Sequence, residues 1–167
     1  MPLPTWDVFI GLAFFVGIAY GFILRRDKTI TTLCSVYMGL VISESLSKTV
    51  FDFFNGNATI ANQLWIRSNV SVSTITIVLF VGSILAITAA INSSNRREGD
   101  ISPFEVIIYS GLAMALIIAS IVGFLPEATR THILEVSKVV RIIFQYKTLL
   151  IIIPPISLVV LNLKKSR

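Results

Sequence analysis

Charged residues are scarce in this chain, and they rarely interrupt its apolar runs. They make up 14% of the 167 residues, whereas hydrophobic residues make up 54%. The charged share is about half of what a soluble globular domain carries. Stretches without any charge cover 8–24, 29–43, 68–95, 106–126 and 148–163. A helix needs about 20 residues to cross a bilayer core, and the first, third and fourth stretches meet that length. The sequence therefore predicts an integral membrane protein.

Cysteine and histidine each occur only once. Cys34 excludes an internal disulfide and a cysteine metal cluster, and His132 alone cannot build a multi-histidine site. The motifs of zinc proteases, nucleotide-binding loops and serine hydrolases do not occur. We therefore predict that the chain is not an enzyme and has no catalytic residue, metal or cofactor. The net charge of +5 does not indicate nucleic-acid binding, because the basic residues flank apolar runs and are not interleaved with stacking aromatics.

Basic residues are also missing before the first apolar run. A secretory signal begins with basic residues, whereas here Arg25, Arg26 and Lys28 follow the run. This order favours a retained membrane span over a cleaved signal. Because basic residues concentrate on the cytoplasmic side, it also predicts an amino terminus outside and a cytoplasmic 25–28 loop.

The runs together predict an all-α fold, a polytopic transmembrane helical bundle with four or five spans plus an amphipathic interfacial helix. Residues 1–126 form the bundle, with spans at about 6–24, 29–54, 70–92 and 104–125. Residues 127–147 alternate polar and apolar positions at helical spacing, which predicts an amphipathic helix that lies along the headgroups or caps the bundle.

Residues 148–167 form a short hydrophobic segment with a basic tail, and the two prolines at 154 and 155 interrupt it. Proline removes an amide donor, so we expect a kink there. A short fifth span is one interpretation, and a re-entrant or interfacial segment is the other. A fifth span agrees with the charge rule, because it places most of the basic flanks on the cytoplasmic side with the 25–28 and 93–101 loops. These flanks, which would also meet lipid headgroups, are Arg25, Arg26, Lys28, Arg96, Arg97, Lys164 and Lys165.

Small residues recur at every fourth position in four of the predicted spans. They are Ala13, Gly17 and Gly21; Ser35, Gly39 and Ser43; Gly82 and Ala86; and Gly111, Ala115, Ala119 and Gly123. Such spacing lets helix backbones approach closely in lipid, where no hydrophobic effect drives helices together. Small residues are also common in membrane helices in general. We predict a compact bundle, which leaves a closed monomer and a homo-oligomer both open.

One acidic residue lies deep within a predicted span. Glu44 is about fifteen residues into the second helix, and Lys48 follows four residues later, in the order that favours an ion pair. Glu44 is therefore either a proton or cation site, since intramembrane charges mark ion pathways, or half of an ion pair where the helix leaves the membrane.

The pattern resembles the colicin V production (CvpA) family of membrane proteins. The likeness rests on the acid in "WDVFI", the glycines and phenylalanine of "GIAYGF" and the following "RR". Small-residue-rich spans and an amphipathic carboxy-terminal stretch complete it over roughly residues 6–146. Tyr20 stands where the family often has a basic residue, and "IIIPPIS" is additional. The resemblance implies a bacterial inner-membrane protein linked to export or envelope homeostasis, and it carries over no catalytic residue.

Three functions are consistent with these features. The first is a non-enzymatic, CvpA-like protein that acts by assembly with itself or with a membrane partner. The second is a small transporter or channel that uses Glu44 and the polar face of the second span. The third is a holin-like protein that forms lesions in the membrane.

Overall fold

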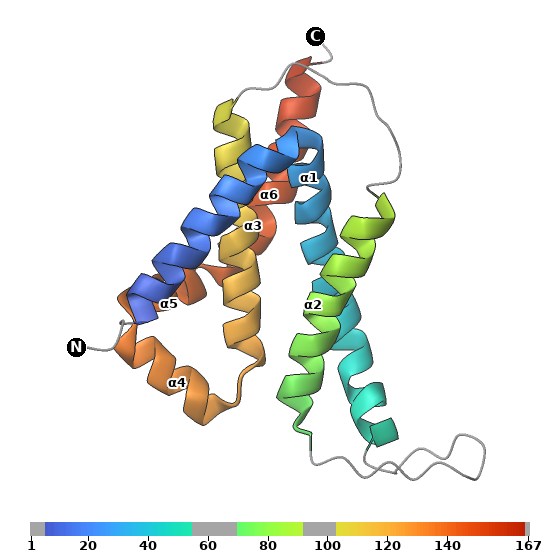
Figure 1. Ribbon diagram of the computed structural model, residues 1–167, viewed down its shortest axis with the longest axis vertical. Helices are drawn as coiled ribbons and strands as arrows, with labels where there is room; N and C mark the ends of the chain where they lie inside the picture. The colour runs from blue at the N-terminus through green and yellow to red at the C-terminus, as the bar shows by residue number, and fades with distance from the viewer. Residues whose placement is uncertain (1–5, 55–69, 92–102, 166–167) are drawn as a thin grey trace.

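The computed structural model describes residues 6–54, 70–91 and 103–165. Their regular structure is helical throughout, which confirms the predicted all-α class for this part of the chain (Figure 1). The helices are α1 (Trp6–Phe54), α2 (Val72–Ile91), α3 (Pro103–Phe124), α4 (Glu127–Val136), α5 (Lys138–Gln145) and α6 (Lys147–Lys165). Four segments are long and apolar enough to cross a membrane: Trp6–Ile23, Thr29–Phe54, Val72–Ile91 and Glu105–Phe124.

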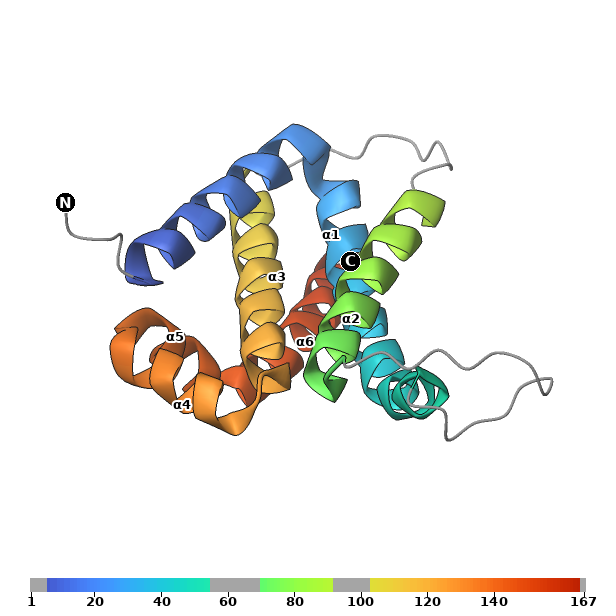
Figure 2. The same cartoon turned by 60° about the horizontal axis from the view of Figure 1, so that its bottom comes forward.

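The first two predicted spans belong to a single helix, α1, which bends sharply between them (Figures 1 and 2). The hydroxyl of Thr29 donates to the carbonyl of Gly21 at 3.4 Å. Eight residues of straight helix would separate these positions by about 12 Å along the axis, so this hydrogen bond requires the bend. In Figure 1 the first arm of α1 rises to this bend and the second arm descends from it, without an intervening loop.

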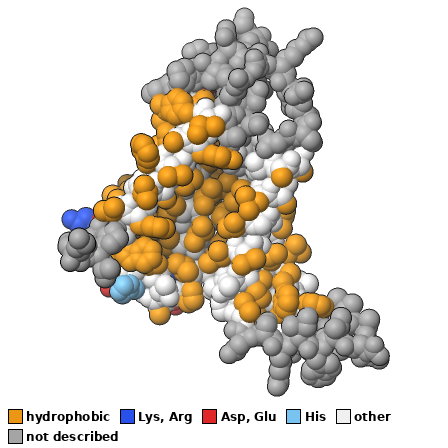
Figure 3. Space-filling view, in the orientation of Figure 1, with side chains coloured by type: hydrophobic (Ala, Val, Ile, Leu, Met, Phe, Trp, Pro, Cys, Tyr) orange, Lys and Arg blue, Asp and Glu red, His pale blue; other side chains and the backbone are white. Residues whose placement is uncertain are grey.

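Helix α3 occupies the centre of the bundle. Half of its membrane-length segment is buried inside the chain, compared with 11% for Trp6–Ile23 and 17% for α2. One core cluster joins Leu33 of α1 to Tyr109 and Ala113 of α3. A second joins Val36 of α1, Phe80 of α2 and Leu116 of α3. The first arm of α1 and helix α2 therefore expose most of their surface, and Figure 3 shows apolar side chains over both of them.

Helices α4 and α5 cover one end of the bundle, below the start of α1 (Figure 2). Their apolar side chains Ile133 and Val140 pack with Ile10 of α1 and Val122 of α3. The predicted single helix over 127–147 is instead two helices, because Ser137 has extended backbone angles, φ −111 and ψ 116. Its hydroxyl accepts the Val140 amide at 3.2 Å and thereby caps α5.

Helix α6 continues past both prolines of the fifth hydrophobic segment. It follows α5 at an angle of 60°, and the two helices together have the length and composition of a broken membrane span or of a re-entrant segment, the two membrane-embedded interpretations that the sequence leaves open. In Figure 1, α6 runs from the level of α5 to the end of the bundle that holds the bend of α1 and the start of α3.

Candidate functional site

The two glycines of the first arm of α1 lie directly against α3. A Cβ at Gly17 would lie 2.2 Å from Cγ of Met114, and a Cβ at Gly21 would lie 2.6 Å from Cβ of Ser110. Met114 and Ser110 are also four residues apart, so one small-residue row meets the opposing helix at two successive turns. The absence of a Cβ at these positions is what lets the backbones approach.

Apart from Gly123, which lies against Lys147, the remaining small residues of the predicted rows divide into three groups. In the second arm of α1, Gly39 lies against α2, where its Cβ would be 3.3 Å from the Phe80 carbonyl oxygen. Ser35, Ser43, Ala115 and Ala119 are buried, and Ala13 is half-buried. Gly82 and Gly111 face no neighbour within 4 Å, and Ala86 is exposed. The spacing therefore occurs on faces that pack within the chain and on faces that do not.

The single hydroxyl proton of Tyr37 is shared between the two carbonyls that the proline pair leaves without amide partners. In a helix the amide of residue i donates to the carbonyl of residue i−4, so Pro154 and Pro155 deprive the carbonyls of Leu150 and Ile151. Tyr37 donates to those oxygens at 3.1 and 2.9 Å. This bridge joins α1 to α6 and explains how α6 tolerates both prolines.

The start of α1 is fixed to the start of α5 by Asp7. The Ser137 hydroxyl donates to the Asp7 carboxylate, and the Val139 amide donates to the same oxygen at 3.5 Å. A carboxylate at a helix amino terminus accepts otherwise unsatisfied amides and interacts favourably with the helix dipole. Asp7 thus links the first turn of α1 to the start of α5, which is far away in the sequence.

We expect Asp7→Ala to loosen α5 selectively. The substitution removes an acceptor from the first turn of α5, so hydrogen exchange of the Val139 and Val140 amides should accelerate about tenfold, equivalent to ~1.4 kcal/mol. Amide exchange followed by mass spectrometry in detergent measures this. Glu127→Ala, at an exposed position on α4, is the matched control. Unchanged exchange in Asp7→Ala would contradict the assignment.

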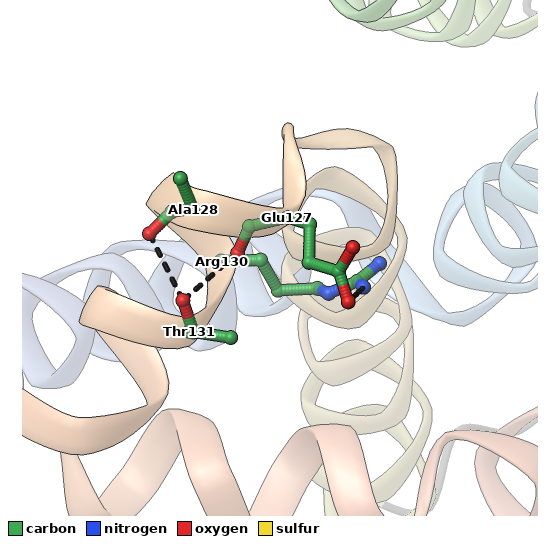
Figure 4. Close-up of polar contacts among 4 residues, drawn as sticks. All are labelled: Glu127, Ala128, Arg130 and Thr131. Atoms are coloured by element: carbon green, nitrogen blue, oxygen red, sulfur yellow. Dashed lines mark hydrogen bonds and ion pairs between the residues drawn. The ribbon is translucent and has the colours of Figure 1, made fainter.

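The end of the bundle around α4 carries most of the described polar side-chain contacts outside the apolar segments. Glu127 forms an exposed ion pair with Arg130 at 3.9 Å, while the Thr131 hydroxyl donates to the carbonyls of Glu127 and Ala128 (Figure 4). Arg141 closes α4 by donating to the Leu134 carbonyl at 2.9 Å. These contacts suit a polar surface, and an exposed pair of this kind adds little stability.

The acid and the base of the second span, Glu44 and Lys48, do not form an ion pair with each other in the structure. Glu44 and Lys48 are both exposed, and neither side chain makes a hydrogen bond or ion pair with another residue in the part of the chain that is described. The hydroxyls of Ser35 and Ser43 are buried and donate at 2.9 Å to the carbonyls of Thr31 and Leu40 in their own helix. Glu44 therefore faces outward, while the serines face the bundle.

Two recesses lie between the helices. One, beside the bend of α1, is a partly open recess of about 50 Å³ that is lined mainly by Gly17, Gly21, Tyr20 and Ser110 with their neighbours. The other, of about 340 Å³, is apolar and also partly open, and it lies between Val50 and Phe54 of α1 and the first turns of α2. Glu44 lines neither of them. Within the described ranges no three His, Cys, Asp or Glu side chains are placed to hold a metal ion.

The basic residues used to orient the chain fall outside the described side chains. Arg96 and Arg97 lie beyond the described ranges, as does the 93–101 loop, and the structure describes only the helical backbone at the positions of the others. Those others are Arg25, Arg26, Lys28, Lys164 and Lys165. Lys147 is described, and its ammonium nitrogen lies 2.9 Å from where a Cβ of Gly123 would be, at the carboxyl end of α3. A cation is favourable there because of the helix dipole.

Sequence reasoning missed two connecting residues, Tyr37 and Ser137. The proline pair does signal that two carbonyls need an external donor, but the sequence does not indicate which helix supplies it. Ser137 is an ordinary cap residue, and only its contact with Asp7 reveals its second role. Comparison of the chain with protein-family models, curated proteins and solved structures finds no match.

Proposed function

We propose that this chain is a non-enzymatic integral membrane protein that acts by helix packing and by assembly with itself or with a membrane partner. The resemblance to colicin V production proteins supports a role in export or envelope homeostasis, and a place in the bacterial plasma membrane. We propose the orientation that the charge rule predicts, with the amino terminus outside and the 25–28 and 93–101 loops in the cytoplasm.

The observation that carries the proposal is the exposed, unpaired charge of Glu44 and Lys48 on a membrane-length helix. Charged side chains in membrane spans are costly unless they pair or face a protein or aqueous surface. Packing within the described chain supplies no such surface at Glu44. A second protein surface against this face of α1 would supply one.

The depth of Glu44 follows from how α1 packs on α2. Gly39 lies between the Phe80 and Ile84 contacts, and α2 runs antiparallel to the second arm of α1. Five residues further along α1, about 7.5 Å, bring Glu44 level with residues near the second turn of α2. The backbone of Glu44 therefore lies alongside the apolar length Val72–Ile91 and not beyond its end.

The transport alternative requires Glu44 to line a path within the bundle. Because Glu44 is exposed and lines neither recess, we expect wild type and Glu44→Gln to give equal ion and proton flux in liposomes, at the level of protein-free vesicles. Flux above that level that disappears in Glu44→Gln would contradict the proposal in favour of a transporter.

Assembly itself is tested on the full chain in its native membrane. We expect mild detergent to extract a species larger than the 18.4 kDa monomer, seen on native gels and by amine crosslinking. Extraction of monomer alone, without any crosslinked product, would overturn assembly. Reporter fusions after Glu98 and Arg167 check the orientation, and a carboxy-terminal reporter found outside would remove the fifth crossing.

A further inference from the structure

The second arm of α1 presents a regular exposed seam to its surroundings. Its exposed positions follow a spacing of four, three, four and three residues, and the seam consists of Cys34, Met38, Val41, Ser45 and Lys48. This alternation is the heptad spacing of residues that meet across two helices with a slight left-handed crossing. Val41 is 61% exposed and Met38 is 52% exposed, so no other described helix covers the seam.

The charges of this face are self-complementary. Glu44 flanks the seam beside Ser45, and Lys48 lies on it one turn later. A partner that offers one base and one acid, at the same spacing and the same depth, would pair both. An identical chain meets that requirement without further assumption, because an isologous interface pairs residue i with j and j with i.

We infer that a second copy of this chain packs on the seam of α1, with Glu44 of each copy paired to Lys48 of the other. Copies inserted in one orientation are related by a twofold axis along the membrane normal, so the two seams run parallel. A four-residue offset corresponds to about 6 Å of helix rise, which extended glutamate and lysine side chains span. Small Ser45, between Val41 and Lys48 on the seam, permits close approach of the backbones there.

This inference rests on the proposed function and names the surface and the partner for it. It also gives a physical reason for exposed charges at this depth. In the dimer both charges gain an opposite charge in a low-dielectric setting, where ionic hydrogen bonds are short and strong. Without the second copy, both side chains would face lipid or reach for the headgroups.

Cysteines introduced at adjacent positions of α1 test, in native membranes, whether the seams of two copies face each other. In a Cys34→Ser background, Ser45→Cys lies on the seam, whereas Leu46→Cys is one residue away and also exposed, about 100° around the helix. We expect copper-phenanthroline oxidation to form covalent dimers of the Ser45→Cys chain and of wild type through Cys34. The Leu46→Cys chain should form at least about fivefold less covalent dimer than the Ser45→Cys chain. Equal crosslinking at positions 45 and 46, or preferential crosslinking at Ala86→Cys on α2, would overturn the inference.

Charge reversal tests the pairing. Glu44→Lys and Lys48→Glu each place like charges opposite one another, so each should reduce the position-45 crosslink by about tenfold. The double exchange restores opposite charges and should restore the crosslink. Failure of the double exchange to recover it, in chains that still insert, would overturn the pairing.

Native gels separate failure of this inference from failure of assembly. A large complex that persists while position 45 never crosslinks to itself would leave the proposed function standing and would refute the second copy as occupant. Monomer alone would refute both.

Discussion

We expect Tyr37→Phe to lower the free energy of unfolding by about 1–3 kcal/mol, which is the cost of leaving buried polar groups without partners. The ring keeps its packing, so the change removes only the hydroxyl that reaches Leu150 and Ile151. Lipid offers no donor to replace it. Unfolding in mixed micelles, followed by circular dichroism during a titration with sodium dodecyl sulfate, measures the loss.

The proline pair provides an internal control for this effect. Replacing Pro154 and Pro155 with alanine restores two amide donors, which can bond to the Leu150 and Ile151 carbonyls within α6. In that background Tyr37→Phe should cost less than about 0.5 kcal/mol. The difference between the two backgrounds is the coupling energy of the bridge. An equal cost in both backgrounds would show that Tyr37 stabilises the chain by some other contact.

The bridge from Tyr37 to α6 is also an example of a contact in this fold that the sequence does not predict. Long charge-free runs predict helices because a chain in lipid must satisfy its backbone internally. The boundaries follow closely, since α2 covers Val72–Ile91 and α3 covers Pro103–Phe124, against predicted ranges of 70–92 and 104–125. Tertiary packing determines which helix accepts the hydrogen bond of the Tyr37 hydroxyl, and the local sequence pattern does not encode that packing.

A pattern of small residues also does not predict which side of each helix faces the bundle. Gly39 and Gly82 belong to equivalent rows in the sequence, yet Gly39 contacts α2 while Gly82 faces open space. In a soluble helix the polar face identifies the outside, but a membrane helix is apolar on both faces. The inward and outward sides therefore have to be read from the structure, and this is why the seam of α1 could not be predicted.

The bend of α1 and the break at Ser137 show the same dependence on distant contacts. The predicted gap between residues 24 and 29 is part of one helix, held by the bond from Thr29 to Gly21. The predicted continuous helix over 127–147 is divided, because Ser137 caps α5 and contacts Asp7. In both places a side-chain hydrogen bond accompanies the change in the path of the backbone.

The contact between Gly21 in the first arm of α1 and Ser110 of α3 gives the second large prediction. Gly21→Ala places a methyl group 2.6 Å from Cβ of Ser110, an atom that is attached directly to the α3 backbone and cannot rotate away. The helices must separate, so we expect a loss of about 1–3 kcal/mol, the usual cost of overpacking a filled site. Gly17→Ala should cost less, because the opposing Met114 side chain is flexible.

Two other glycines are matched controls for this effect. Gly82→Ala and Gly111→Ala add the same methyl group to a helix at positions with no neighbour within 4 Å. There, the higher helix propensity of alanine should stabilise the chain by up to about 1 kcal/mol. The same substitution thus has opposite signs at packed and open positions, which unfolding in mixed micelles resolves.

A compensating change on α3 completes the test. Ser110→Gly removes the atom that Gly21→Ala would strike, and it also removes a hydroxyl that already bonds within α3, to the Val106 carbonyl at 2.7 Å. The double variant should regain most of the stability lost in Gly21→Ala, apart from the intrinsic cost of glycine in a helix, about 1 kcal/mol. If Gly21→Ala behaved like Gly111→Ala, the two helices would not be in contact at Gly21. The first arm of α1 would then have to pack elsewhere, because its position depends on Gly17, Gly21 and the Asp7 link to α5.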